Sequence, residues 1–246
     1  MKTLLVTSAV TFVPHNYDNL VLPLAKDPNI EALVVIDNRS FDIILKALLL
    51  ILTLAAPKMG WHLLKNFFDD SLKRKQAAYA AAGKKVLIVK DVNSAESLHL
   101  LSELQPDLIL NARTRSFFKK KLLALPKMGC INIHHGLLPD QRGLMCDFWA
   151  HLFDTPAGFS IHEMTSKLDD GSLLKVVEVP SDKKDYLASL DLGASLEAQA
   201  ASNVLRDISV RGKIEGQANL KTDTTVYRSN PRLRDFYRLR SKGVSI

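Results

Sequence analysis

Short segments that are apolar almost throughout recur along the chain, and longer segments with helical spacing separate them. Strands of this kind are typical of parallel sheets that are covered on both faces, whereas half-exposed strands alternate apolar and polar residues. The pattern therefore predicts an α/β fold, with a mostly parallel sheet and helices on both faces. The apolar segments are KTLLVTS (2–8), IEALVVID (30–37), KKVLIVK (84–90), PDLILNA (106–112) and GCINIHH (129–135).

Helices are expected between these strands. NLVLPLA (19–25) and SAESLHLLSEL (94–104) have helical spacing, and Ser94 can cap the second of them. With 246 residues, 47% of them hydrophobic, the chain can bury the core of one α/β domain with an appendage. The two cysteines are too few for a disulfide framework, and the start of the chain does not resemble a signal peptide, so a cytoplasmic setting is expected.

The positive charge is concentrated at one end of the chain. Of the formal net charge of +7, residues 211–246 carry nine Lys or Arg against three Asp or Glu, a net +6. Several common sites are excluded, because no G-x-G-x-x-G follows the first strand and no P-loop, G-x-S-x-G or H-E-x-x-H motif occurs. No metal site is predicted, since the adjacent His134 and His135 point to opposite faces of a strand and no cluster of further ligands completes a site.

The segment INIHHGLLPDQRG (131–143) stands where the last apolar strand runs into a loop. Open α/β sheets bind their ligands at that edge. Alternation along the strand puts Asn132 and His134 on one side and Ile133 on the other, so that an amide and an imidazole project together into the crevice. A lone histidine is more often structural, but an asparagine at this spacing and place favours a functional site.

Two motifs carry a resemblance to a known family. NIHHGLLPDQRG (132–143) resembles the Asn-x-His-x-x-Leu-Leu-Pro segment of the 10-formyltetrahydrofolate-dependent formyltransferases, which act on methionyl-tRNA, glycinamide ribonucleotide and amino sugars. AGFSIHEMTSKLDDGSLL (157–174) resembles the family's strand and loop that lead to Leu-Asp-x-Gly. The resemblance implies a Rossmann-like catalytic domain over residues 1–180. The sequence pattern adds an apolar helical insertion at about 41–82 within this domain, and residues 181–246 are expected to form a helical, basic extension.

The resemblance implies Asn132, His134 and Asp169 as catalytic residues, with Asp170 the less favoured partner of the histidine. When an amine attacks a formyl carbonyl, the tetrahedral intermediate carries negative charge on oxygen. The Asn132 amide can donate to that oxygen, and His134 can stabilise it and move a proton toward the leaving nitrogen. Asp169 would orient the imidazole and favour its charged form.

The implied formyl donor is 10-formyltetrahydrofolate, and the implied acceptor is a small-molecule amine. Two departures from the family pattern bear on their binding: NARTRSFF (111–118) replaces small and apolar residues in a loop that holds the pterin, and His135 and Gly136 replace residues that shape the amine pocket. The expected donor-binding residues are Asn111, Ala112, Arg113, Thr114, Lys167 and Asp169, and the expected amine-binding residues are His135, Gly136 and Arg142.

Three functions stay open for a chain with these motifs. GLMCDFWAHL (143–152) is closest to the members that act on amino sugars, which favours an amino sugar, free or lipid-linked. Methionyl-tRNA is the second substrate, although the resembling tRNA enzymes carry a further β-barrel domain. A non-catalytic relative that binds folate or a nucleotide is the third reading, and the presence of all three catalytic positions argues against it.

The apolar insertion is the least explained part of the sequence. Residues 43–56 form an apolar run of 14 residues with Lys46 inside, too short for the roughly 20 residues of a membrane span. Pro57 then starts a second apolar and basic segment, so a helix pair is expected. The apolar surface of residues 41–68 is expected to be buried against a partner. Two partners remain possible: a second copy of the chain, as in a homodimer, or the inner face of a membrane in a peripheral contact.

Overall fold

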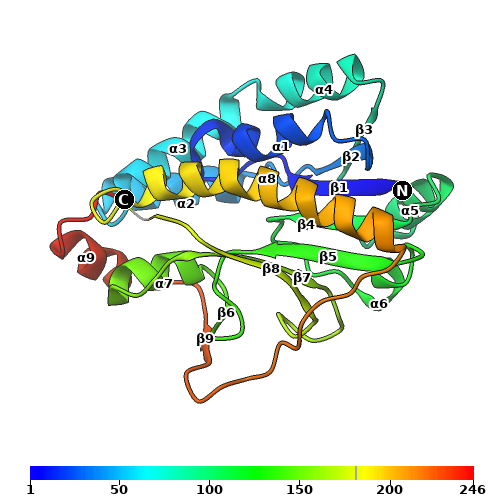
Figure 1. Cartoon of the computed structure of the whole chain (residues 1–246). Coiled ribbons are helices and arrows are strands. Elements are labelled where there is room, and N and C mark those ends of the chain that lie inside the picture. Colours follow the sequence, from blue (N-terminus) through cyan, green and yellow to red (C-terminus); the bar gives the residue numbers. More distant parts are fainter. Residues whose placement is uncertain (181) are drawn as a thin grey trace.

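A seven-stranded sheet forms the centre of the protein, whose computed structural model describes residues 1–180 and 182–246. The strands lie in the order β3-β2-β1-β4-β5-β7-β8, and the first five are parallel. This confirms the predicted mostly parallel α/β architecture (Figure 1). The strands are β1 (Thr3–Ser8), β2 (Ile30–Ile36), β3 (Lys85–Val89), β4 (Leu108–Ala112), β5 (Gly129–His134), β7 (Gly158–Glu163) and β8 (Leu173–Glu178).

One strand prediction needs correction. The segment at 84–90 was expected to be covered on both faces, but β3 is an edge strand and Ile88 remains 45% exposed. The fully buried strands are instead β1 and β4 in the middle of the sheet. An apolar run therefore identified the strand correctly but not its place in the sheet.

The antiparallel strands β7 and β8 extend the sheet beyond β5. The register places His162 of β7 directly opposite Asn132 of β5, and Ser160 opposite His134. A separate two-stranded sheet pairs β6 (Gln141–Gly143) with β9 (Val226–Arg228), which ties the segment after β5 to the C-terminal region. These pairings build one side of the crevice at the end of β5.

Helices cover both faces of the sheet, as predicted, and each face has its own buried cluster (Figure 1). The smaller cluster packs α5 and α6 against one face, and Ser94 caps α5 by accepting a hydrogen bond from the Ser97 backbone. The larger cluster packs the remaining covering helices against the other face. The helices are α1 (Asp18–Leu24), α2 (Phe41–Leu52), α3 (Pro57–Phe68), α4 (Ser71–Ala81), α5 (Ala95–Glu103), α6 (Lys120–Leu123), α7 (Cys146–Phe153), α8 (Tyr186–Arg211) and α9 (Leu233–Ser241), with a short 3-10 turn, η1 (Pro14–Tyr17), before α1.

The C-terminal region contributes to the same core as the sheet. Leu187 and Leu205 of α8 and Leu239 of α9 are buried in one cluster with residues of β1, β2 and β4. The predicted boundary between 180 and 181 falls at the one residue outside the described part of the chain. Residues on its two sides thus share a core, and residues 182–246 contain α8, β9 and α9.

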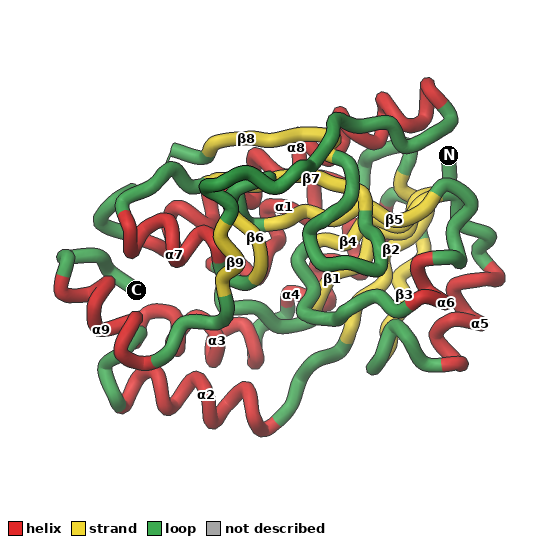
Figure 2. Tube along the Cα trace, turned by 90° about the horizontal axis from the view of Figure 1, so that it is seen from below, coloured by secondary structure: helices red, strands yellow, loops and turns green. Residues whose placement is uncertain are grey.

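The insertion at 41–82 forms three helices, of which α2 and α3 make an antiparallel pair and α4 returns to the sheet. Pro57 is the first residue of α3. Gly60 lets the pair approach closely, because a Cβ there would lie 2.6 Å from the Ala47 carbonyl oxygen and 2.8 Å from Ile51 Cγ1. In Figure 2, α2 lies along the outside of the molecule. Within the described residues, none of the helices combines the length and apolar character that crossing a bilayer requires.

Candidate active site

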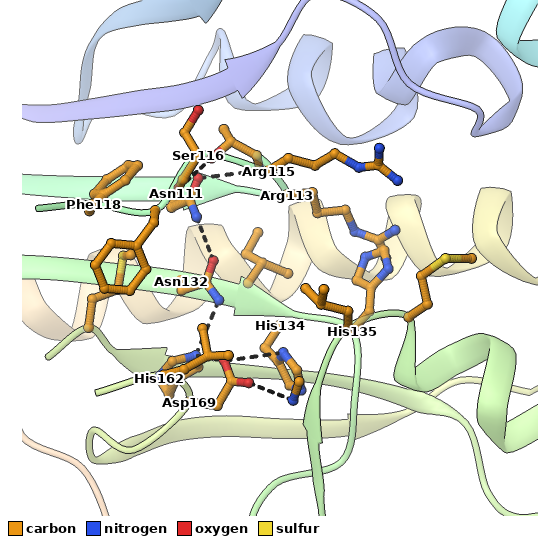
Figure 3. Close-up of a pocket in the computed structure, with 18 of the residues that line it drawn as sticks. Asn111, Arg113, Arg115, Ser116, Phe118, Asn132, His134, His135, His162 and Asp169 are labelled. Carbon is orange, nitrogen blue, oxygen red and sulfur yellow. Dashed lines mark hydrogen bonds and ion pairs between the residues drawn. The ribbon is translucent and has the colours of Figure 1, made fainter. Parts of the chain in front are cut away.

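A cavity of about 610 Å³ opens at the carboxyl ends of β4 and β5. Its walls come from the loop after β4, the end of β5, the segment that leads into α7, and the loop between β7 and β8. Figure 3 shows that Asn132, His134, His162 and Asp169 gather on one side of it. The structure therefore brings Asn132, His134 and Asp169 together at the edge of the sheet where the sequence predicted them, and their chemical roles stay predictions.

Asn132 is held by two neighbours that fix the direction of its amide. Its Oδ1 accepts a hydrogen bond of 2.8 Å from Asn111 Nδ2, and its Nδ2 lies 3.2 Å from His162 Nε2 (Figure 3). Burial, aided by the nearby His134, lowers the pKa of His162 to about 4, so this ring is neutral near pH 7. Its Nδ1 donates to the Glu163 carbonyl at 2.7 Å, which leaves Nε2 to accept from Asn132. One N–H of the Asn132 amide stays available to the cavity.

His134 lies between two acceptors. Its Nε2 is 2.8 Å from the Gln141 carbonyl oxygen, and its Nδ1 is 3.5 Å from Asp169 Oδ1. Only a ring with both nitrogens protonated can present a donor to each of these oxygens. The arrangement thus suits a histidine that shuttles a proton, with the Asp169 carboxyl group beside it to orient the ring.

Asp169 occupies a loop that the rest of the site holds firmly. Its Oδ2 accepts from the Gly143 backbone at 2.8 Å, and its carbonyl oxygen accepts from Arg142 Nη1 at 2.5 Å. Its φ of 52° is left-handed, a conformation that aspartate tolerates better than most residues. Asp170 lies away from the histidine and 3.5 Å from Arg142, which agrees with the choice of Asp169.

Arg142 does not take the position expected of an amine-binding residue. Its side chain is completely buried outside the cavity lining, and Nη2 donates to the carbonyl and the Oδ1 of Asn219, each at 2.9 Å. The guanidinium therefore joins the Asp169 loop to the C-terminal region. Gly136 is also absent from the cavity lining and packs behind the histidine, since a Cβ there would lie 2.6 Å from His134 Nε2.

Most of the expected donor-binding residues do line the cavity. Asn111, Arg113 and Thr114 lie along its wall, and Lys167 is an exposed residue at its rim. Ala112 is the exception, because it is buried inside β4. The exposed Arg115 adds a second positive charge to the lining, and Phe117 and Phe118 give the same loop an apolar surface.

Arg113 and His135 meet in a buried charged cluster on the α8 side of the cavity. Arg113 donates to Glu197 of α8 and to the Tyr17 hydroxyl. His135 Nδ1 lies 3.1 Å from Asp147 Oδ2, and its Nε2 lies 3.3 Å from Glu197 Oε1. Burial raises the pKa of Glu197 to about 8, although Arg113 opposes the shift, and burial likewise raises the pKa of Asp147. The cluster thus favours a state in which Glu197 and Asp147 share one proton over a state in which both are ionised.

His162, Asp147 and Glu197 are site residues that the sequence reasoning missed. His162 belongs to a motif that the sequence singled out, but its place depends on β7 pairing with β5, and period-two alternation in FSIHE could have suggested that strand. Asp147 and Glu197 sit on helices, and nothing in the sequence shows that both carboxyl groups face His135.

Comparison with known proteins identifies relatives of this chain. The family model described as formyl transferase matches residues 69–205. The bifunctional polymyxin resistance protein ArnA of Wigglesworthia glossinidia brevipalpis is 31% identical over 130 residues, which cover 52% of this chain and 19% of the relative. The methionyl-tRNA formyltransferase of Bacillus subtilis (strain 168) is 34% identical over 129 residues, 50% of this chain and 41% of the relative. The chain therefore spans less than half the length of these two relatives.

Solved structures share the fold. A phosphoribosylglycinamide formyltransferase from Streptococcus pneumoniae TIGR4 superposes with a TM-score of 0.59 at 17% identity, covering 85% of this chain and 99% of that one. At this identity the likeness shows the fold alone, and it agrees with the predicted class of fold.

Proposed function

The chain belongs to the formyl transferase family, and from this premise we propose that it moves a formyl group from 10-formyltetrahydrofolate to a primary amine. The observation that carries the proposal is the meeting of Asn132, His134 and Asp169 at the cavity. An amide donor, an imidazole and a carboxylate are the groups that acyl transfer to an amine needs.

Asn132 would stabilise the negative charge that develops on the formyl oxygen. Its carbonyl is bonded to Asn111 and one N–H to His162, so the remaining N–H is oriented before any substrate arrives. A donor fixed in advance needs no reorganisation during the reaction, which is why such donors lower barriers strongly. The neutral His162 supports this orientation without competing for the oxyanion.

His134 would transfer a proton from the attacking amine to the leaving nitrogen. The attacking amine must lose a proton and the leaving nitrogen of the folate must gain one, and an imidazole next to the reacting atoms can carry it between them. Asp169 Oδ1 lies 3.5 Å from Nδ1, where the carboxyl group can orient the ring during the transfer. Arg142 and the Gly143 backbone hold Asp169 in that place.

The cavity fits a folate in size and lining. Its volume of about 610 Å³ lies within the range of roughly 300–1,000 Å³ for small-molecule sites. Apolar side chains suited to a flat ring line it beside the polar strand ends: Phe117, Phe118, Met164 and Leu168. When bound, 10-formyltetrahydrofolate supplies the formyl carbonyl, and Arg115 and Lys167 offer positive charge for a carboxylate tail.

For the amine we favour an amino sugar, in free or lipid-linked form. The segment that resembles the amino-sugar enzymes contributes Gly143, Leu144 and Met145 to the cavity wall. The same wall includes His135 and Asp147, which can receive the amino group of the acceptor. The name of the Bacillus relative keeps methionyl-tRNA as the second candidate, and both belong in the first assay.

The test is an assay of the purified full chain with 10-formyltetrahydrofolate and a panel of amines, following the absorbance of released tetrahydrofolate. The panel contains nucleotide-linked and lipid-linked amino sugars, glycinamide ribonucleotide and methionyl-tRNA. Transfer to an amino sugar alone supports the full proposal. Transfer only to methionyl-tRNA supports formyl transfer but contradicts the amino-sugar acceptor. Folate binding without any transfer contradicts enzymatic activity and indicates a folate-binding protein.

His134→Ala is the variant that tests the mechanism. We expect turnover to fall at least about 100-fold, the scale of a general acid–base group, in a variant whose cooperative melting transition shows that it is folded. His99→Ala is the matched control, because His99 is an exposed histidine of α5 that lies outside the cavity lining. If the His134 variant keeps more than about a tenth of the turnover, the residue has no catalytic role.

A further inference from the structure

An apolar stripe runs along the outside of α2. Phe41, Leu45, Leu48, Leu49 and Leu52 are all exposed, and at about 100° per residue they occupy one face of the helix. Phe41 is 70% exposed and Leu52 is 78% exposed, whereas Ala47 on the opposite face is buried against α3. The helix therefore has two apolar faces, and only one of them is covered by the protein.

Basic side chains outnumber acidic ones on α2 and on the neighbouring helices α3 and α9. The buried Asp235 of α9 lies 3.9 Å from Arg234 and 3.7 Å from Arg238, and it offsets one positive charge. The exposed charged side chains of α2, α3 and α9 are five basic and one acidic, so that the net charge with Asp235 is +3. They are Asp42 and the five residues called the basic rim, Lys46, Lys65, Arg234, Arg238 and Arg240. A second copy bound face to face would bring two such rims together, whereas anionic headgroups would neutralise the rim.

The C-terminal helix fixes part of this charge next to the stripe. Tyr237 of α9 donates to the Thr53 carbonyl at 2.6 Å, and Arg240 donates to the Leu54 carbonyl. Leu54, Leu233 and Tyr237 are themselves exposed, so the apolar surface continues from the end of α2 toward α9. Figure 2 shows α9 beside the C-terminal end of α2. Two segments far apart in sequence thus form one amphipathic surface.

The dimensions suit a helix that lies on a membrane. The 12 residues of α2 span about 18 Å, well short of the roughly 30 Å of a bilayer core. A short helix with an apolar stripe and a basic rim typically lies in the plane of the headgroups. We propose that the α2–α9 surface, formed by the stripe, Leu54, Leu233, Tyr237 and the basic rim, docks on an anionic lipid membrane.

Docking would place the cavity close to the bilayer. α2 follows the carboxyl end of β2, and the cavity lies at the carboxyl ends of β4 and β5, which run parallel to β2. Asn230 lines the cavity three residues before α9 begins. An enzyme docked in this way could reach an amine carried by a lipid. This consequence rests on the proposed function, whereas the docking itself is independent of it.

The experiment is sedimentation of the full chain with sucrose-loaded vesicles of phosphatidylcholine alone or with 30% phosphatidylglycerol. We expect binding to the anionic vesicles that weakens as salt is raised. The double variant Leu45→Asp and Leu49→Asp should bind at least tenfold more weakly. The matched control is Val210→Asp, because Val210 is 84% exposed on α8 and lies outside this surface. A second variant, Arg234→Gln with Arg238→Gln, should lose binding while leaving the apolar stripe intact.

Each other outcome overturns the proposal. The proposal is wrong if the wild type does not bind anionic vesicles at low salt. It is also wrong if the wild type and both double variants bind equally. A dimer in analytical ultracentrifugation that dissociates with Leu45→Asp and Leu49→Asp, without vesicle binding, assigns the surface to a second copy. Binding of tRNA in place of vesicles assigns it to nucleic acid. Folding of every variant is checked by its melting temperature, and none of these results depends on formyl transfer.

Discussion

Glu197 is a carboxylic acid with no exposed surface, so its ionisation must affect stability. Burial, partly opposed by Arg113, raises its pKa from the ordinary 4.5 to about 8. Between these values the folded protein holds a proton that the unfolded chain has released, so the free energy of unfolding falls as pH rises, by at most about 1.4 kcal/mol per pH unit. Glu197→Gln cannot ionise. We therefore expect the wild type to lose stability relative to this variant from pH 5 to pH 8, measured by urea unfolding.

The control for this prediction is Glu96→Gln, a glutamate exposed on the first turn of α5. Its stability difference from the wild type should stay constant over the same range. Parallel curves for the wild type and Glu197→Gln would show that Arg113 keeps the carboxyl group ionised and that Asp147 or His135 holds the shared proton.

Single residues show where sequence reasoning succeeds. Asn132 and His134 could be placed together because alternation along a strand is a local property, and the strand itself was recognisable. Arg142 could not be placed, because an arginine in a loop after a strand has the same sequence signature whether it faces a ligand or the carbonyls of Asp169 and Asn219. Its burial depends on Asn219, which is 77 residues away along the chain.

Secondary-structure elements were likewise predictable where they depend on local sequence and not where they depend on long-range pairing. The parallel strands were predictable because burial on both faces leaves them apolar throughout. β7 and β8 were harder, since β7 carries the polar His162 and Glu163 at its end and β8 lies at an edge where several residues are exposed. The three-residue strands β6 and β9 have no pattern of their own, because their pairing is long-range.

The α2–α3 pair permits a test at the scale of elements. Gly60→Ala should gain up to about 1 kcal/mol of helix propensity, but its Cβ would collide with the Ala47 carbonyl and Ile51. We expect a net loss of about 1–3 kcal/mol in the free energy of unfolding. Gly193→Ala in α8 is the matched control, because its Cβ would meet nothing closer than 3.8 Å and should stabilise the protein. A stabilising Gly60→Ala would contradict the close packing of the pair.

At the scale of the whole molecule, the cavity joins parts that are distant in sequence. Its walls come from the loops after β4 and β7, from His135, and from Asn230 near the C-terminus, while α8 and α9 share the core of the sheet. A ligand in the cavity therefore contacts segments that separate only when the protein unfolds. Residues on both sides of position 181 should unfold in one transition, and a ligand should shift that transition as a whole.

We expect a non-reactive 10-formyltetrahydrofolate analogue to raise the melting temperature, because a ligand that binds only the folded state stabilises it. The shift should follow the binding isotherm, with about 2.7 kcal/mol of stabilisation when the analogue is at 100 times its Kd. p-Aminobenzoylglutamate, which lacks the pterin, is the control and should have a much smaller effect. Differential scanning calorimetry gives both the shift and the number of transitions. The absence of a shift at millimolar analogue would remove folate from the cavity, and two transitions of which only one moves would show that the regions on either side of residue 181 unfold separately.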